Sequence, residues 1–239
     1  MNKTKIEWAD STWNPTTGCT KISAGCKNCY AEKMAIRLKA MGQQKYKNGF
    51  KLTLHPEILE KPYSWKKSRT VFVNSMSDLF HEDIPPEFIK KVFKVMNDNR
   101  NHIFQVLTKR ADILLEYNKK LEWSPNIWMG VTVENQDNVS RIDHLRETDA
   151  AIKFLSIEPL IGEINAIHLN NIDWVIVGGE SGIGARLMKK DWVIPIKKCC
   201  LKKNIPFFFK QWGGVNKKKT GRLLEGKTYD ASPKKNLHG

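Results

Sequence analysis

The chain has 239 residues, 41% of them apolar and eight of them tryptophans, which is enough for a sizeable hydrophobic core and excludes an intrinsically disordered protein. Its 40 lysines and arginines outnumber 25 acidic residues and give a formal net charge of +15. This charge favours polyanionic partners, above all nucleic acid, with simple solubility as the alternative. The start is polar and no apolar run approaches the length of a membrane span, so we expect no signal peptide, no membrane and a cytoplasmic location.

Three of the five cysteines lie close together near the amino end. Cys19, Cys26 and Cys29 are spaced C-x6-C-x2-C and come just before a helical pattern over 30–41. In a reducing compartment, clustered thiols indicate metal or redox chemistry rather than disulfides. Three thiolates on a four-iron cluster leave one iron open for another molecule. The spacing therefore predicts an iron–sulfur cluster.

The residues around the cysteines leave a second interpretation open. Gly18 and Gly25 permit the backbone turns that wrapping a small object demands. A closed structural zinc site needs four ligands, and a distant histidine such as His55 or His81 would be the fourth. The other two cysteines, Cys199 and Cys200, are adjacent on a predicted helix and point in different directions, so we expect them to pack rather than bind.

After residue 69 of the chain, short apolar segments alternate with helical patterns. We expect strands at 70–73, 103–107, 127–133, 152–157, 174–177 and 205–209, and helices at 55–59, 86–97, 111–121, 138–146 and 191–203. Continuous β-branched or aromatic strands that alternate with helices predict a parallel sheet. Six to seven such units favour an α/β fold of the (β/α) barrel type, a partial or complete TIM-like barrel, over a doubly wound sheet.

The barrel is expected to occupy residues 1–214 as one domain. Residues 215–239 are rich in lysine and glycine and form a basic tail that wraps the surface or frays.

Each expected strand turns polar at its carboxyl end, where a (β/α) barrel builds its active site. The expected cofactor contacts are Ser75, Ser77, Asp78, Glu134, Asn135, Glu158, Gly178, Gly179 and Glu180, and the expected substrate contacts are Lys109, Arg110, Lys210 and Gln211. The three-cysteine segment is itself a loop between a strand and a helix, so we expect it at the same edge. The cysteines and this polar ring would then line one cavity.

Several of these positions also have structural interpretations. Lys109 and Arg110 can hold a carboxylate or phosphate, or simply begin a solvated helix. Glu158, which precedes Pro159, needs a partner because it is expected to be buried. That partner is a ligand, Lys109 or Arg110 across the cavity, or another residue in an internal salt bridge. The glycine-rich run 178–182 lets the backbone approach a ligand or is a plain tight turn. The sequence leaves these alternatives open.

Several stretches of the sequence resemble a phage- and prophage-associated three-cysteine protein family of unknown function. They are residues 11–15, 18–19, 25–26, 29–32, 72–81, 105–110, 178–182 and 207–213. The resemblance covers nearly the whole chain, and the family looks like a divergent branch of the radical S-adenosylmethionine superfamily. It implies a [4Fe–4S] cluster on the three cysteines, with S-adenosylmethionine on the fourth iron. One electron, from a donor such as flavodoxin or ferredoxin, would cleave the sulfonium to a 5′-deoxyadenosyl radical.

The chain departs from the superfamily pattern in three places. Asn28 replaces the aromatic residue that usually precedes the third cysteine in the superfamily. The commonest spacing there is C-x3-C-x2-C, and the Gly-Gly-Glu stretch that meets the methionine ammonium follows the second strand. Here the first gap is six residues and Gly-Gly-Glu stands at 178–180, several strands later. By position, the resemblance then assigns the cofactor contacts as follows: Ser75, Ser77 and Asp78 for the ammonium, Glu134 and Asn135 for the ribose, and Glu180 as a further contact.

The sequence as a whole predicts a radical S-adenosylmethionine enzyme that acts on a nucleic acid, a nucleotide or a modified base, in the host cytoplasm if the gene is phage-encoded. Two alternatives remain from other classes. One is a zinc-containing nucleic-acid-binding protein without radical chemistry. The other is a protein that keeps the cluster but acts as a non-catalytic partner.

Overall fold

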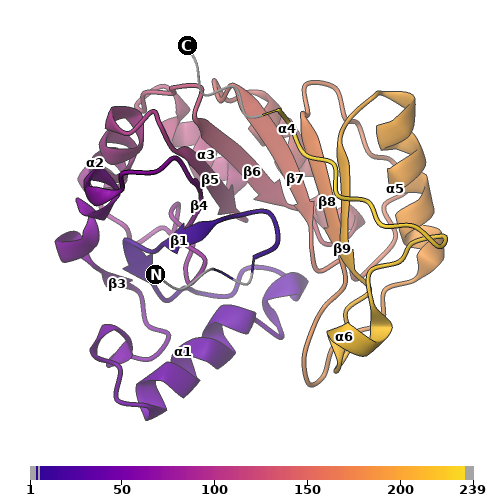
Figure 1. Cartoon of the computed structure of the whole chain (residues 1–239), viewed down its shortest axis with the longest axis horizontal. Coiled ribbons are helices and arrows are strands. Elements are labelled where there is room, and N and C mark those ends of the chain that lie inside the picture. The colour runs from indigo at the N-terminus through magenta and orange to yellow at the C-terminus, as the bar shows by residue number, and fades with distance from the viewer. Residues whose placement is uncertain (1–3, 5, 235–239) are drawn as a thin grey trace.

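Seven parallel strands form the main sheet of the computed structural model, which describes residue 4 and residues 6–234 (Figure 1). In sheet order the strands are β1 (Ser11–Trp13), β4 (Thr70–Val73), β5 (Ile103–Thr108), β6 (Ile127–Thr132), β7 (Ile152–Ile157), β8 (Trp174–Gly178) and β9 (Phe207–Gln211). Every neighbouring pair is parallel, and the sheet order follows the chain order. The sheet curls into a half-barrel, so the prediction of a TIM-like partial barrel is confirmed.

Helices connect most of the strands. They are α1 (Tyr30–Ala40), α2 (Pro86–Asp98), α3 (Ala111–Asn118), α4 (Ser140–Arg146), α5 (Lys190–Lys202) and α6 (Lys217–Thr220). Short 3-10 helices lie at Ala24–Cys26, Gln44–Tyr46, Pro56–Ile58, Lys61–Ser64 and Gln136–Asn138, and β2 (Thr16–Thr17) pairs antiparallel with β3 (Thr53–Leu54). Because consecutive parallel strands are joined by crossovers of one hand, α2 to α5 cover the same outer face of the sheet.

Side chains alternate between two cores across the sheet. On β8, Val175 and Val177 pack outward with the helices, whereas Trp174 and Ile176 point to the inner, concave face. The helical side of the outer core follows the 3.6-residue period, as on α2, where Phe88, Ile89, Val92, Phe93 and Met96 are all buried. Buried side chains that recur at every second residue on the strands therefore pack against buried side chains that recur every 3.6 residues on the helices. Together they form one core between sheet and helices.

The inner core is small and aromatic. Trp128, Phe154, Trp174 and Phe208 gather on the concave face, and Trp8 from the amino-terminal segment packs against them. These rings fill the amino half of the concave face. The polar ends of the strands are left at the carboxyl half.

The structure differs from the expected elements in a few places. The strand β1 was not predicted as such, the helix expected at 111–121 ends at Asn118, and the residues 55–59 contain only a 3-10 turn. No helix joins β7 to β8 in the described segment 158–173. Among the residues described, no helix has both the length and the apolar character that crossing a membrane requires.

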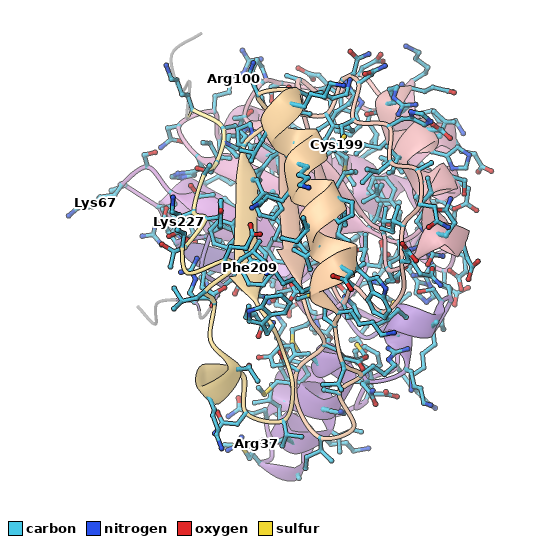
Figure 2. All side chains as sticks on the ribbon, turned by 90° about the vertical axis from the view of Figure 1, so that its right-hand side faces the viewer. Arg37, Lys67, Arg100, Cys199, Phe209 and Lys227 are labelled. Carbon is cyan, nitrogen blue, oxygen red and sulfur yellow. The ribbon has the colours of Figure 1, made fainter. Side chains whose placement is uncertain are left out.

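The carboxyl-terminal segment runs along β9 rather than away from the body. The backbone N–H of Phe209 donates to the carbonyl of Tyr229 at 2.8 Å, and the Trp212 indole donates to the carbonyl of Leu223 at 2.8 Å. Figure 2 shows Phe209 on β9 in front of the viewer, with Lys227 of this segment beside it. The segment therefore adds a covering layer at the edge of the sheet.

Candidate functional site

The segment 18–29, called the cysteine loop below, lies at the carboxyl edge of the half-barrel. Gly18 forms a parallel bridge with Ser77, just after β4, and Cys29 directly precedes α1. Gly18 has φ +84°, and a Cβ there would stand 2.2 Å from the carbonyl oxygen of Lys51, so this position admits only glycine. All three cysteines of the loop are free and half-buried.

Arg110, two residues after β5, contacts the start of the cysteine loop. Its side chain is 4% exposed, and Nη1 donates to Cys19 Sγ at 3.4 Å while Nη2 donates to Thr20 Oγ1 at 2.7 Å. Nε donates to Glu82 at 2.7 Å. Burial, reinforced by the charge of Asp78, raises the pKa of the Cys19 thiol to about 11 even though Arg110 opposes the shift. Arg110 is therefore a buried cation that directs N–H groups at a thiol.

Glu134, two residues after β6, contacts the middle of the loop. Its side chain is fully buried, and Oε1 accepts a hydrogen bond of 2.6 Å from the Ser23 hydroxyl. Oε2 accepts from Arg141 at 2.8 Å, and the Lys109 ammonium lies 3.6 Å from Oε1. A Cβ on Gly25 would stand 2.5 Å from this carboxylate. The loop thus rests directly on a buried carboxylate that two cations neutralise.

The second thiol has a different environment from the first. Burial pushes the pKa of Cys26 upward, but a hydrogen bond from the Ile22 backbone and the positive charge of Lys109 outweigh it and leave the pKa lowered. The Ser23 hydroxyl also lies 3.7 Å from Cys26 Sγ. Cys26 is therefore the thiol of this pair that ionises more readily, and ionised sulfur is the form that binds metals.

A substitution at Gly25 tests whether the cysteine loop packs against Glu134. In Gly25→Ala the new methyl group would overlap the carboxylate, so the loop must move, and we expect a loss of about 1–3 kcal/mol in the free energy of unfolding. Urea unfolding measures it. The matched control is Gly162→Ala, whose Cβ would meet only Asn135 Cβ at 3.0 Å. An equal effect of the two substitutions would contradict this packing.

Glu180, two residues after β8, contacts the end of the loop. Its carboxylate accepts hydrogen bonds of 2.9 Å from the side-chain amide of Asn28 and from the backbone and Nε of Arg186. Burial alone would raise the pKa of Glu180, but the hydrogen bonds from Arg186 and Asn28 outweigh it and lower the pKa to about 2. An ionised Glu180 therefore holds Asn28, one of the two residues between Cys26 and Cys29.

This lowered pKa predicts a pH dependence of stability. Because the folded-state pKa lies below the usual value of 4.5, the ionised Glu180 stabilises the fold above about pH 4.5, and the contribution is lost as the pH falls towards 2. The difference in unfolding free energy between the natural chain and Glu180→Gln should then be constant above about pH 4.5 and shrink as the pH falls from there to 2.5. Denaturant unfolding at several pH values measures it, with the exposed Glu163→Gln as the control. A difference independent of pH would contradict the assignment.

The loop is thus held from three strand ends. Arg110 after β5, Glu134 after β6 and Glu180 after β8 each bind a different part of it. Sequence reasoning placed all three at the carboxyl edge but did not predict that they contact the loop. The small polar residues between the cysteines, Thr20, Ser23 and Asn28, were the available signal, because each is the partner of one of these ions.

The predicted residues after β4 bind their neighbours. Asp78 accepts hydrogen bonds from the Thr108 hydroxyl at 2.7 Å and the Lys109 backbone at 3.0 Å, and lies 3.4 Å from the Arg110 guanidinium. The Ser75 hydroxyl donates to Asn14 Oδ1 at 3.1 Å, and the Ser77 hydroxyl donates to the carbonyl of Thr16 at 3.0 Å. These side chains join the ends of β1, β4 and β5.

A second polar group lies at the ends of β7 to β9. The Lys210 ammonium lies 2.9 Å from the Glu158 carboxylate, and the Gln211 amide donates to it at 3.2 Å. The partner of Glu158 is therefore Lys210, and the expected pairing with Lys109 or Arg110 is not formed. A Cβ on Gly178 would lie 3.2 Å from the same carboxylate, which makes this glycine part of the group.

The remaining predicted residues lie around these groups. Gly179 allows a close approach of backbones, because a Cβ there would stand 2.0 Å from the carbonyl oxygen of Trp212. The Asn135 side-chain amide donates to the Asp137 carboxylate at 2.9 Å. Cys200 is fully buried, and burial raises the pKa of its thiol to about 12. Figure 2 places Cys199 on α5, well away from Arg37 of α1.

The two histidines considered as zinc ligands bind threonine hydroxyls. His55 Nε2 lies 2.8 Å from Thr17 Oγ1, and His81 Nε2 lies 3.0 Å from Thr20 Oγ1. Within the described part of the chain, no three or more His, Cys, Asp or Glu side chains stand close enough to hold one metal ion. A hollow of about 670 Å³ opens beside Cys19, between α1 and the segment 48–52, with His81 in its wall.

Fold and site together define a class of protein, an α/β half-barrel that carries a three-cysteine loop on the carboxyl edge of its parallel strands. The chain belongs to the family described as "Protein of unknown function (DUF5131)", whose model matches residues 3–233.

Two further comparisons concern individual proteins. No curated protein sequence matches the chain. Among solved structures, the chain is similar to a spore photoproduct lyase complexed with dinucleoside spore photoproduct, at 12% sequence identity and a TM-score of 0.48. The match covers 82% of this chain and 62% of the lyase chain, so this chain spans less than two thirds of the length of that protein.

Proposed function

We propose that this protein is a radical S-adenosylmethionine enzyme whose [4Fe–4S] cluster is held by Cys19, Cys26 and Cys29. The observation that carries the proposal is the placement of three free thiols on one loop, seated by buried ions at the carboxyl edge of a parallel half-barrel. In barrels this edge is where catalysis occurs. The resemblance of the loop and strand-end motifs to a radical S-adenosylmethionine branch supports the same assignment.

The donors around the thiols fit such a cluster. Cluster sulfurs carry negative charge, and N–H groups directed at them stabilise it. The Arg110 guanidinium already donates to Cys19 Sγ, and the charge of Lys109 lowers the pKa of Cys26. Three thiols without a fourth ligand also suit a cluster that keeps one iron for another molecule. We therefore assign Arg110 and Lys109 as residues that position and stabilise the ligands.

We place the cofactor and substrate contacts in the polar group at the ends of β7 to β9. When bound, the cluster and S-adenosylmethionine supply an organic radical that removes a hydrogen atom from the substrate. The chain's own residues orient and shield that chemistry. Glu158 and Lys210 form a half-buried ion pair there, and Gly178 leaves room beside it. A carboxylate accepts from an ammonium or hydroxyls, and a lysine binds a carboxylate or phosphate.

The substrate class that we propose is a nucleic acid, a nucleotide or a modified base, because the chain carries a net charge of +15. Binding to a short DNA or RNA duplex should then weaken steeply as salt is raised, since each phosphate contact releases counterions. Anaerobically loaded protein that neither binds nucleic acid in a salt-dependent way nor turns over nucleotides would contradict this substrate class and leave the cluster unaffected.

Metal analysis tests the cluster itself. Protein purified without oxygen should be brown and contain about four irons and four sulfides per chain. Colourless protein with one zinc per chain would instead indicate a structural zinc site and overturn the proposal.

A further inference from the structure

A cavity of about 330 Å³ lies at the amino end of the strands, the end of the half-barrel opposite the cysteine loop. The carboxyl-terminal segment closes one wall, since the Trp174 indole donates to the carbonyl of Ala231 at 2.8 Å and Asp230 bridges to Phe208. In Figure 1 this segment, drawn in yellow, runs past β9 away from α1. The size is at the lower end of small-molecule pockets.

Several of the residues that line this cavity carry buried polar atoms without partners. Ten buried side-chain nitrogens and oxygens of the described residues lack a hydrogen-bond partner, and four of them belong to its lining: Trp8 Nε1, Thr70 Oγ1, Gln105 Oε1 and Arg222 Nε. Gln105 is 1% exposed and Thr70 is 2% exposed. A buried polar atom left without a partner costs about 1–3 kcal/mol. Their concentration around one hollow leaves donors and acceptors that a bound molecule could pair with.

The walls of the cavity are flat and aromatic. Trp8 meets Phe208 and Trp174 edge-on, with ring centroids 5.9 Å and 6.4 Å apart, and Trp128 packs edge-on against Trp174. Aromatic lining of this kind suits a planar ring system, and stacking of a base on an aromatic ring stabilises binding by about 1–3 kcal/mol. The shape of the walls therefore favours a flat ligand over a flexible chain.

The charges in the lining exclude a phosphate. Glu7, Asp10 and Asp230 contribute three carboxylates against the single guanidinium of Arg222, which is already paired with Asp230. A phosphate group would meet net negative charge here. An uncharged ring with N–H groups and ring nitrogens would meet acceptors and donors, among them Gln105 Oε1 and Trp8 Nε1.

We propose that this cavity binds a planar, uncharged nitrogen heterocycle, a nucleobase or its nucleoside, at a site separate from the cysteine loop. The ring stacks among the tryptophans, Gln105 Oε1 accepts one of its N–H groups, and Trp8 Nε1 or Thr70 Oγ1 donates to a ring nitrogen or carbonyl. The site depends on neither iron nor S-adenosylmethionine, so its test is independent of the proposed function.

Tryptophan fluorescence of the metal-free chain tests the site, because three tryptophans form its walls. Titration with adenosine, guanosine and cytidine should give saturable quenching with at least one of them, and the corresponding 5′-monophosphate should bind at least tenfold more weakly. Gln105→Leu should weaken the binding by at least tenfold, with Thr70→Val as an independent second variant. The chain with all three loop cysteines replaced by alanine should bind the nucleoside as well as the natural chain does.

Stability measurements separate a binding role from a structural one. Gln105 Oε1 has no partner in the free protein, so Gln105→Leu should unfold at an unchanged or higher urea concentration. Absence of quenching by all three nucleosides would show that the cavity holds water only and would overturn the proposal. Equal binding of nucleoside and monophosphate, or binding that disappears with the cysteines, would also overturn it.

Discussion

Replacing any one of Cys19, Cys26 and Cys29 with alanine should abolish the cluster, and bound iron should fall from about four per chain to below one. Each thiol is expected to ligate a different iron. With one thiol removed, the two that remain do not retain the cluster. The loop offers no replacement, because the nearby histidines already bind Thr17 and Thr20. Iron and sulfide assays after anaerobic reconstitution measure the effect.

The chain contains its own control for this experiment. Cys199 is half-buried on α5, where its thiol lies 3.9 Å from the carbonyl oxygen of Ile167 and far from the loop. Cys199→Ala should therefore keep the full iron content. Loss of iron in this variant, or full iron content in any of the three loop variants, would contradict the assignment of the ligands.

Replacing Glu134 with leucine should destabilise the fold by about 3–5 kcal/mol, the cost of removing one partner from a buried charge cluster. The carboxylate is fully buried, and its loss leaves the guanidinium of Arg141 without its ion partner and the ammonium of Lys109 without a counter-charge. The same change removes the acceptor for the Ser23 hydroxyl and so releases the middle of the cysteine loop. Urea unfolding of the metal-free protein measures the free energy directly.

A surface carboxylate provides the comparison for Glu134→Leu. Glu87 pairs with Lys90 at 2.8 Å, but its side chain is 74% exposed, so Glu87→Leu should change the unfolding free energy by less than about 1 kcal/mol. Glu134→Gln, which keeps the shape and loses the charge, should lie between the two. An effect of Glu134→Leu no larger than that of Glu87→Leu would show that the loop is not seated on this carboxylate.

The fold was largely predictable because its strands are continuous and apolar. Runs such as Trp174–Gly178 are buried on both faces, which is typical of a parallel sheet covered by helices, and their order along the chain gives the order in the sheet. The strand β1 escaped prediction because it has only three residues, Ser11–Trp13, two of them polar. Its place in the sheet comes from pairing with β4, which no local pattern reveals.

The location of the site was predictable, but its internal contacts were not. Polar residues at strand ends meet at one edge by geometry alone, so Arg110, Glu134 and Glu180 were expected near the cysteines. The bond between Ser23 and Glu134, however, joins residues 111 positions apart, and that between Asn28 and Glu180 joins residues 152 positions apart. Pairings at such separations depend on the curvature of the sheet. The sequence therefore predicted where these side chains lie but not that they contact the loop.

The cavity at the amino end of the strands escaped prediction for the same reason. Its polar atoms, among them Thr70 Oγ1 and Gln105 Oε1, lie within strands that read as apolar, and Arg222 comes from a tail that was expected to wrap or fray. Only the curled sheet and the segment beside β9 bring them together.

The most direct test of the central claim is the formation of 5′-deoxyadenosine by the anaerobically reconstituted protein with S-adenosylmethionine and dithionite. The account predicts this product from the natural chain and from Cys199→Ala, and none from Cys19→Ala. A protein that holds its full complement of iron and sulfide and yet forms no 5′-deoxyadenosine would contradict the claim that the three-cysteine loop starts radical chemistry at the mouth of the half-barrel.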